Sequence, residues 1–133
     1  VLVGISPEEI RNDKIITYKR TTNQRELAEI YTAADVFANP TMEENFPTVN
    51  LEALACGTPI VTYRTGGSPE SVDEKTGIVV EQGNLKQMLD AILNVTKNGK
   101  EHYSNACIDK SENYDMNARF NDYVDLYEKI IKE

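Results

Sequence analysis

Short apolar, β-branched runs alternate with amphipathic helical patterns along the first two thirds of the chain, and this alternation constrains the fold more than any other feature. Runs separated by helical segments are typical of βα units, in which crossover helices connect parallel strands. We therefore expect an α/β fold with a parallel sheet of about five strands and helices on both faces. The runs that read as strands are 1–4, 14–18, 35–39, 59–63 and 77–80.

The helical segments between these runs carry start and stop signals. Asn23 is followed by Glu26 at the spacing of a capping box, in which two side chains satisfy free N–H groups at a helix start. The same spacing recurs at Asn84 and Gln87. Gly57 predicts a helix end, because glycine readily adopts the left-handed conformation found there. The helix after Asn84 has the expected apolar face Leu85, Met88, Leu89 and Ile92.

The two ends of the chain follow different patterns. Residues 1–4 read as the end of a buried strand, and Pro7 with the acids after it predicts a short helix or turn to about residue 12. Residues 100–113 predict a weakly amphipathic helix, and Asp115 is a candidate cap for a final helix. The apolar stripe of that helical C-terminal extension consists of Phe120, Tyr123, Val124, Tyr127, Ile130 and Ile131. This spacing predicts a continuous apolar stripe of about four turns.

Length and charge limit the classes of function. The 133 residues suffice for a single domain, 1–133, with one core. A net charge of -8 argues against a nucleic-acid partner, because binding a phosphate backbone requires clustered Lys and Arg. Cys56 and Cys107 show no C-x-x-C or Cys/His spacing, so the cysteines do not indicate a metal site. With no apolar run of about 18 residues and no signal pattern, we expect a cytoplasmic protein.

Two carboxylates, Glu44 and Glu52, carry the candidate chemistry. Glu44 lies in the loop after the run at 35–39, and Glu52 lies near the start of the following helix. A loop and a helix start at one edge of a parallel sheet form the arrangement that binds phosphorylated ligands, and a fixed carboxylate can accept hydrogen bonds from adjacent ribose hydroxyls. The alternative, a solvated loop acid and a solvated helix face, stays open on spacing alone.

Other polar residues near this edge have structural and functional interpretations. Gly66 and Gly67 form either an ordinary turn or a backbone surface that a ligand approaches closely. Lys19, Arg20 and other basic residues near the edge are either surface charges or phosphate contacts. His102 lies in a late helical segment, far along the chain from the two carboxylates, and no nucleophile and base arrangement is visible.

The order of motifs resembles a known enzyme family. Residues 35–61 read DVFANPTMEENFPTVNLEALACGTPIV, followed by GGSPE at 66–70 and GIVV at 77–80. This string resembles the C-terminal, donor-binding domain of family 4 retaining glycosyltransferases (glycosyl transferases group 1), which have the two-domain GT-B fold. The resemblance extends over nearly the whole chain and implies a Rossmann-like domain.

The resemblance also implies roles for individual residues. Glu52 would bind the ribose of a nucleotide-diphosphate sugar, and Glu44 would be the catalytic residue that meets the transferred sugar. The reaction implied is transfer of the sugar to a hydroxyl acceptor with retained configuration, without a metal or cofactor, in surface polysaccharide or glycan biosynthesis. The remaining substrate-binding positions implied are Asn45, Phe46, Pro47 and Thr48 near the sugar and phosphates, and Tyr18, Lys19 and Arg20 near the base.

The chain departs from the family pattern in two respects. The family usually has glycine near Phe46, where this chain has Asn45 and Pro47, and proline has no N–H to donate to the sugar donor. The resemblance further implies that the family's first βα unit, with its phosphate-binding Arg and Lys, and the N-terminal acceptor domain lie outside this sequence. We therefore expect a fragment that is inactive alone and exposes apolar surface at its truncated edge, which favours self-association. Any peripheral membrane contact would come through the parts outside it.

Two other functions remain open from the sequence. The chain could be a non-enzymatic nucleotide-binding module, or part of a different GT-B enzyme such as a phosphorylase or an epimerase, since one fold hosts several chemistries.

Overall fold

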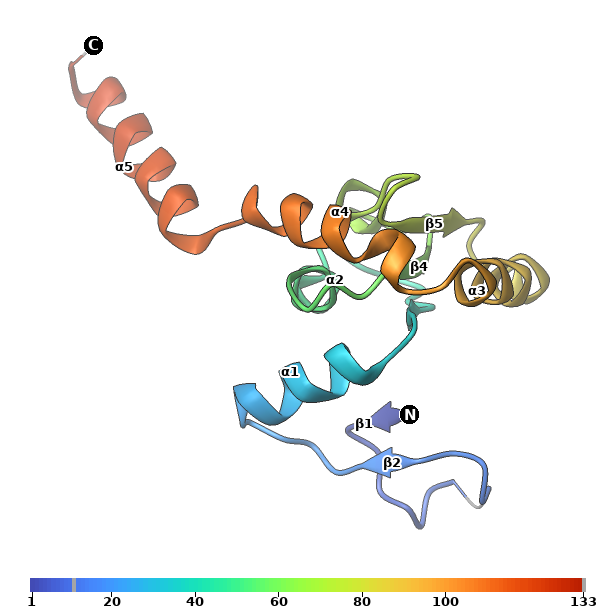
Figure 1. Cartoon of the computed structure of the whole chain (residues 1–133). Coiled ribbons are helices and arrows are strands. Elements are labelled where there is room, and N and C mark those ends of the chain that lie inside the picture. Colours follow the sequence, from blue (N-terminus) through green and yellow to red (C-terminus); the bar gives the residue numbers. More distant parts are fainter. Residues whose placement is uncertain (11, 133) are drawn as a thin grey trace.

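All five expected strands form, and they are connected by helices and turns (Figure 1). The computed structural model describes residues 1–10 and 12–132. The strands are β1 (Leu2–Val3), β2 (Thr17–Tyr18), β3 (Phe37–Asn39), β4 (Ile60–Tyr63) and β5 (Gly77–Val80). The helices are α1 (Gln24–Ala33), α2 (Thr48–Ala55), the 3₁₀ helix η1 (Ser68–Ser71), α3 (Leu85–Asn98), α4 (Glu101–Glu112) and α5 (Met116–Lys132).

The strands are all parallel, but they form two sheets instead of one. β1 pairs with β2, and β3, β4 and β5 pair in that order, with β4 in the centre. The α/β class and the parallel pairing predicted from the sequence are therefore confirmed. The division into a two-stranded and a three-stranded sheet is a feature that the alternation of patterns did not indicate.

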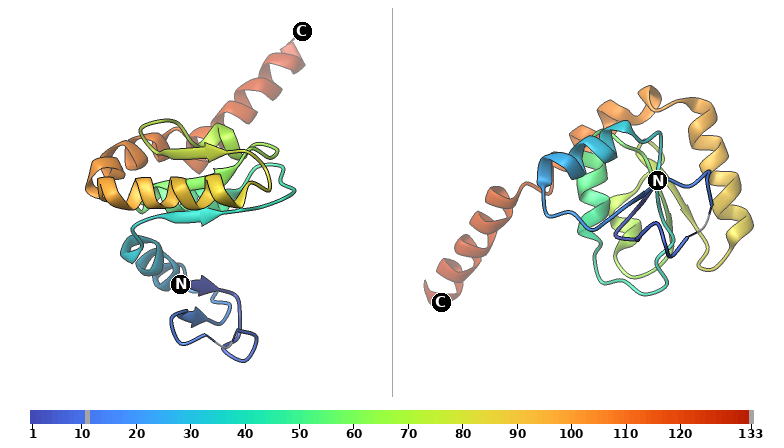
Figure 2. Two further views of the ribbon diagram at one scale, coloured as in Figure 1. Left: turned by 90° about the vertical axis from the view of Figure 1, so that its right-hand side faces the viewer. Right: turned by 90° about the horizontal axis from the view of Figure 1, so that it is seen from below.

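The core surrounds β4, whose four residues are all buried. α2 and α3 lie on opposite sides of the larger sheet, and α4 crosses beside α2 (Figures 1 and 2). Helices therefore cover both faces of this sheet, as expected. The buried apolar residues are Tyr31, Ala53, Leu54, Ile60, Val61, Tyr63, Val72, Val80, Met88, Ala91, Val95, Tyr103 and Cys107.

The N-terminal segment is more exposed than its sequence predicts. Val1 and Val3 are 68% and 40% exposed, so the expectation of a buried strand at residues 1–4 is wrong on burial. The strand expected at 14–18 is reduced to Thr17–Tyr18. Residues 7–9 form a turn, and the part of the expected helix at Arg11 lies outside the described residues. A sheet of two short strands buries little of the apolar surface that its composition supplies.

The helix signals predicted correctly where α1 and α3 begin, but not every capping contact or buried residue. Asn23 caps α1 by accepting from the N–H groups of Arg25 and Glu26, while the Glu26 carboxylate accepts from Thr21 instead of completing the capping box. The face expected for α3 is wrong at Leu85 and Leu89, which are 74% and 56% exposed. The side of α3 that meets the core carries Met88, Ala91 and Val95.

Helix α5 extends away from the rest of the molecule (Figures 1 and 2). Asp115 accepts a hydrogen bond from the N–H of Ala118 at 2.9 Å, so the predicted cap is confirmed. None of the described residues of α5 is buried, and its apolar stripe faces solvent along its length. The self-association expected from apolar surface at the truncated edge stays a prediction.

The loops that follow β3 and β4 pack against each other at the carboxyl edge of the larger sheet. The N–H of Gly67 donates to the carbonyl of Asn45 at 2.7 Å, and the Thr65 hydroxyl donates to the carbonyl of Thr41 at 3.1 Å. A Cβ on Gly67 would lie 2.5 Å from the Asn45 carbonyl oxygen, and one on Gly66 would lie 1.6 Å from the Glu44 carbonyl oxygen. The two glycines therefore allow the loop with Glu44 to approach closely.

Replacing Gly67 by alanine tests this close approach. Gly67 has a φ of -83°, which alanine adopts freely, so the cost of Gly67→Ala comes from contact with the Asn45 loop. We expect a loss of about 1–3 kcal/mol in the free energy of unfolding, measured by chemical denaturation, and a shifted Asn45 amide NMR signal. Lys86→Ala is the control, because the Lys86 side chain is exposed on α3 and its removal should change neither the stability nor the Asn45 signal appreciably. An unchanged Asn45 signal in Gly67→Ala would contradict the packing described.

An ion pair attaches α4 to the turn before β5. Lys110 Nζ lies 2.6 Å from Asp73 Oδ2, and the Asp73 side chain is 47% exposed. Burial alone would raise the pKa of the Asp73 carboxyl, but hydrogen bonds from Lys110 and from the N–H of Lys75 outweigh it and lower this pKa. The folded state therefore gains stability from the Asp73 carboxylate at neutral pH and loses it as the pH falls through the lowered pKa.

Removing the Lys110 charge should reduce this pH dependence. We expect Lys110→Met to lower the free energy of unfolding at neutral pH by about 0.5 kcal/mol, a small value because solvent screens the half-exposed pair. The difference from the unmodified chain should shrink as the pH falls below about 3.9, the ordinary pKa of Asp in the unfolded chain, and vanish below the lowered pKa of folded Asp73. Denaturation curves across this pH range measure it, with Lys132→Met, which breaks the exposed pair with Glu128 on α5, as the control. A difference that persists undiminished at low pH would exclude the Asp73 contribution.

Candidate functional site

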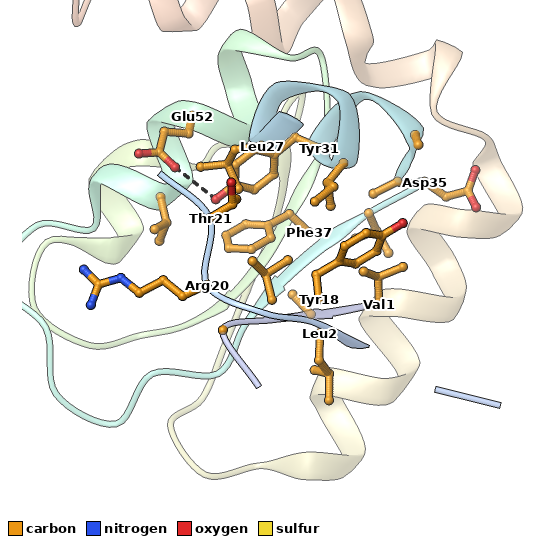
Figure 3. A pocket seen from close by; sticks show the side chains of 18 of the residues that line it. Val1, Leu2, Tyr18, Arg20, Thr21, Leu27, Tyr31, Asp35, Phe37 and Glu52 are labelled. Atoms are coloured by element: carbon orange, nitrogen blue, oxygen red, sulfur yellow. Dashed lines mark hydrogen bonds between the residues drawn. The ribbon is translucent and has the colours of Figure 1, made fainter. Parts of the chain in front are cut away.

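Glu52 projects from the second turn of α2 and is held by Tyr31 of α1. The Tyr31 hydroxyl donates to Glu52 Oε2 at 3.1 Å, and the Tyr31 ring packs edge-on against Phe37 at 5.3 Å between centroids. Burial, with the nearby Glu52 carboxylate, raises the pKa of the Tyr31 phenol, so the phenol stays a hydrogen-bond donor at neutral pH. The Glu52 residue itself is exposed, and its second oxygen points away from Tyr31 (Figure 3).

A cavity of about 980 Å³ lies between the N-terminal sheet, α1 and β3 (Figure 3). Three residues that were predicted to bind the nucleotide line this cavity, namely Tyr18, Arg20 and Glu52. Among the residues that the structure describes, Arg20 is the only Lys or Arg in the lining. Glu52, Thr21 and Arg20 lie toward one end of the cavity, on the left of Figure 3. The structure thus brings a fixed carboxylate, a cation and an aromatic ring around one space.

The residues nominated for the sugar end form a second group on the loop before α2. Glu44 is half-buried, and its Oε1 accepts a hydrogen bond from the N–H of Asn45 at 3.0 Å. Phe46 packs against the Tyr114 ring at 5.8 Å between centroids. Pro47 is buried at the N-cap of α2. None of Glu44, Asn45, Phe46, Pro47 and Thr48 lines the cavity with Glu52.

The other nominated residues occupy different positions. Lys19 is exposed and is not part of the cavity lining. The backbone of Gly66 and Gly67 is approached by the protein's own Glu44–Phe46 loop, so a contact with a ligand stays a prediction for these glycines. His102 packs edge-on against the neighbouring Tyr103 ring on α4, at 4.8 Å between centroids.

A buried polar network that the sequence analysis did not predict connects the end of β3, helix α2 and the 3₁₀ helix η1. Asn50 of α2 is fully buried, and its Oδ1 accepts from Asn39 at the end of β3 at 3.0 Å. Its Nδ2 donates to the Ser71 hydroxyl at 2.9 Å, and that hydroxyl donates to the carbonyl of Ser68 at 2.8 Å. The network ties α2 to β3 and η1, and so fixes both ends of the segment that carries Glu44. The available signal was an amide residue within an otherwise apolar helix face, which is rarely left unpaired.

The described residues contain neither a metal-ligand cluster nor a membrane-spanning helix. Within residues 1–10 and 12–132, no group of three or more His, Cys, Asp or Glu side chains is arranged to hold a metal ion. The helices over the same residues include none that is both long and apolar enough to cross a bilayer.

Comparisons with known proteins agree with this architecture. The sequence model of the family described as Glycosyl transferases group 1 matches residues 1–98. The D-inositol 3-phosphate glycosyltransferase of Corynebacterium jeikeium is 40% identical over 86 residues, which cover 64% of this chain and 20% of that protein. The enzyme of the same name from Mycobacteroides abscessus is 29% identical over 119 residues, which cover 89% of this chain and 27% of that protein.

A solved structure shares the fold. The sucrose-phosphate synthase of Thermosynechococcus elongatus superposes on 95% of this chain and 33% of its own length, with a TM-score of 0.80 and 23% sequence identity. This chain therefore spans between a fifth and a third of the proteins it matches. The resemblance read from residues 35–80 is confirmed, and the chain belongs to the glycosyl transferases group 1 family.

Proposed function

We propose that the chain is the donor-binding part of a retaining glycosyltransferase, which moves a sugar from a nucleotide-diphosphate sugar to a hydroxyl acceptor. The observation that supports this most directly is the position of Glu52, which Tyr31 holds at a cavity that Arg20 and Tyr18 also line. One Glu52 oxygen is occupied by Tyr31, and the other is free to accept a hydrogen bond from a ribose hydroxyl. The cavity volume lies within the range of ligand sites.

The nucleoside and the sugar are assigned to different ends of the site. Tyr18 offers a ring on which a base can stack, and Arg20 a charge that pairs with a phosphate. Glu44, on the loop that precedes α2, is assigned to the sugar, together with the exposed Asn45 and Thr48. Pro47 is buried at the helix start and has no N–H, and the Asn45 N–H already donates to Glu44, so the Phe46 and Thr48 backbone amides would make any loop contacts with the donor.

The reaction assigned to the whole protein breaks the bond between the anomeric carbon and the diphosphate, and forms a bond from that carbon to the acceptor oxygen. Charge builds up on the leaving diphosphate, so catalysis depends on cations and amides that neutralise it and on a fixed sugar position. Arg20 is one cation for this task. Further phosphate-binding residues and the acceptor domain are assigned to parts outside these residues, so this chain alone binds the donor without transferring its sugar.

The proposal also assigns a cellular location, a cofactor requirement and a pathway to this reaction. A cytoplasmic location, catalysis without metal or cofactor, and a place in surface polysaccharide or glycan synthesis fit a nucleotide-sugar donor. Any peripheral contact with a membrane is assigned to the parts outside this chain. The relatives are named for inositol 3-phosphate, which makes a phosphorylated polyol a first acceptor to assay with the longer protein.

One observation favours a second candidate, a nucleotide-binding module without transferase activity. Glu44 does not line the cavity that contains Glu52, so the geometry supports the nucleoside contacts more directly than the sugar contacts. Nucleotide binding is common to both candidates, and sugar transfer by the longer protein separates them.

Alanine variants of the two carboxylates test the assignment of roles. We expect Glu52→Ala to weaken binding of UDP, GDP or ADP, whichever binds best by calorimetry, by roughly 10- to 100-fold, the value of a hydrogen bond to a charged group. Glu44→Ala should change nucleotide affinity much less, because this residue is assigned to the sugar.

Two controls accompany this comparison. Glu43→Ala removes an adjacent exposed carboxylate from the Glu44 loop, and Tyr31→Phe keeps the Glu52 charge while removing its hydrogen bond. Neither should match the loss from Glu52→Ala. A larger loss from Glu44→Ala would mean that the roles are reversed, and no binding of any nucleotide by the unmodified chain would exclude the proposed site.

A further inference from the structure

Helix α1 is attached to the rest of the molecule mainly at its last turn. Tyr31 is its one buried residue among those that the structure describes, while Leu27 and Ile30 line the open cavity. Over the same described residues, the hydrogen bonds from α1 to distant parts of the chain all involve Tyr31 or Thr32. The position of the Tyr31 side chain beside Glu52 therefore depends on how this last turn is held.

The last turn of α1 contains no charge that could stabilise its carbonyl groups. The last carbonyls of a helix have no partner within it, and this end carries a partial negative charge, so a cation there is favourable. α1 has no basic residue in its last turn, and its C-cap is Ala34. Any cation that stabilises these carbonyls must therefore come from another part of the chain.

Lys100, at the N-cap of α4, supplies this cation. Its Nζ donates to the carbonyl of Thr32 at 2.6 Å and to the Thr58 hydroxyl at 2.9 Å, and it lies 3.5 Å from the carbonyl of Tyr31. The Thr58 hydroxyl donates in turn to the same Tyr31 carbonyl at 2.6 Å. These contacts join the start of α4, the turn before β4 and the last turn of α1 in one network.

The surroundings of Lys100 indicate that its charge serves α1 and not α4. A cation at the N-terminus of a helix opposes the partial positive charge there, so Lys100 is unfavourable for its own helix. The side chain is partly buried, and none of the ion pairs among the described residues includes it. A partly buried charge needs polar partners in place of water, and the partners found here are the oxygens around the end of α1.

We infer that Lys100 is a positioning residue for Glu52 and acts through Tyr31. Lys100 holds the Tyr31 backbone from its carbonyl side, and the Tyr31 hydroxyl donates to Glu52 Oε2 at 3.1 Å (Figure 3). Lys100 is not part of the cavity lining, so it acts without touching a bound nucleotide. The inference rests on the proposed role of Glu52 in binding ribose, and it adds the residue that fixes the orientation of this carboxylate.

The NMR signal of the Tyr31 Cζ, measured without nucleotide, tests the first step. Its assignment comes from the signal that disappears in Tyr31→Phe. Lys100→Met keeps the length of the side chain and removes its charge and donors, so we expect it to shift the Tyr31 signal toward its position in Glu52→Ala. Lys97→Met is the matched control, because it removes the same charge from an exposed position in the last turn of α3. This control should leave the Tyr31 signal unchanged.

Nucleotide affinity, measured by calorimetry, tests the second step. Lys100→Met should weaken binding of the best ligand among UDP, GDP and ADP by roughly 3- to 10-fold, less than Glu52→Ala does, because its effect is indirect. In the Tyr31→Phe background the same substitution should change the affinity by less than about 2-fold, since substitutions that act through one contact are not additive. Lys97→Met should leave the affinity unchanged, which separates positioning from a general attraction of phosphates.

Thr58→Val provides a second route if Lys100→Met does not fold. It removes the hydroxyl that links the Lys100 ammonium to the Tyr31 carbonyl, and it leaves the charge of Lys100 in place. We expect it to shift the Tyr31 signal in the same direction as Lys100→Met. Lys100→Arg keeps both the charge and the N–H donors, so it should preserve the Tyr31 signal and the nucleotide affinity.

Two results would overturn the inference. The first is a Tyr31 signal that is the same in the unmodified chain, in Lys100→Met and in Thr58→Val. The second is an equal loss of nucleotide affinity from Lys100→Met with and without the Tyr31 hydroxyl, which would mean that Lys100 acts by another route. If the unmodified chain binds no nucleotide, the proposed function fails, and the Tyr31 signal still decides whether Lys100 sets the contact with Glu52.

Discussion

Burial of β4 is the interaction on which the rest of the larger sheet depends. Its side chains lie between α2 and α3, and its backbone pairs with β3 on one side and β5 on the other. Ile60 and Val61 are fully buried, and together they remove enough apolar surface from water to contribute several kcal/mol, at about 2 kcal/mol each. Because the strands are parallel, all three end at one edge, and the loops with candidate chemistry meet there.

Short polar connections then set the geometry of that edge. The Thr62 hydroxyl donates to the carbonyl of Asn39 at 3.0 Å, and Asn50 connects the end of β3 to η1 through buried amide hydrogen bonds. A buried polar network is stable only when its members are paired, which makes it a specific constraint on where α2 begins. The positions of Glu44 before α2 and Glu52 within it follow from this constraint more than from their own contacts.

The sequence predicted features that depend on local chemistry and missed those that depend on neighbours. Asn23 caps α1 and Gly57 ends the α2 region with a φ of +67°, because caps and left-handed turns are decided by the residue itself. The buried face of α3 was predicted wrongly at Leu89, since small Ala91 lets the helix approach the sheet on another side. The Tyr31 contact with Glu52 crosses 21 positions, and no pattern in either helix indicates it.

The regions of the chain differ in how much of their apolar surface is buried within these residues. Residues from β3 to α4 contain nearly all of the buried core, whereas β1, β2 and α5 contribute no buried apolar side chain among the described residues. The exposed apolar groups of the N-terminal sheet lie near unpaired strand edges, while those of α5 lie on a helix whose backbone is satisfied internally. The two regions therefore expose apolar surface in different settings, since a strand edge leaves backbone groups unpaired and a helix does not.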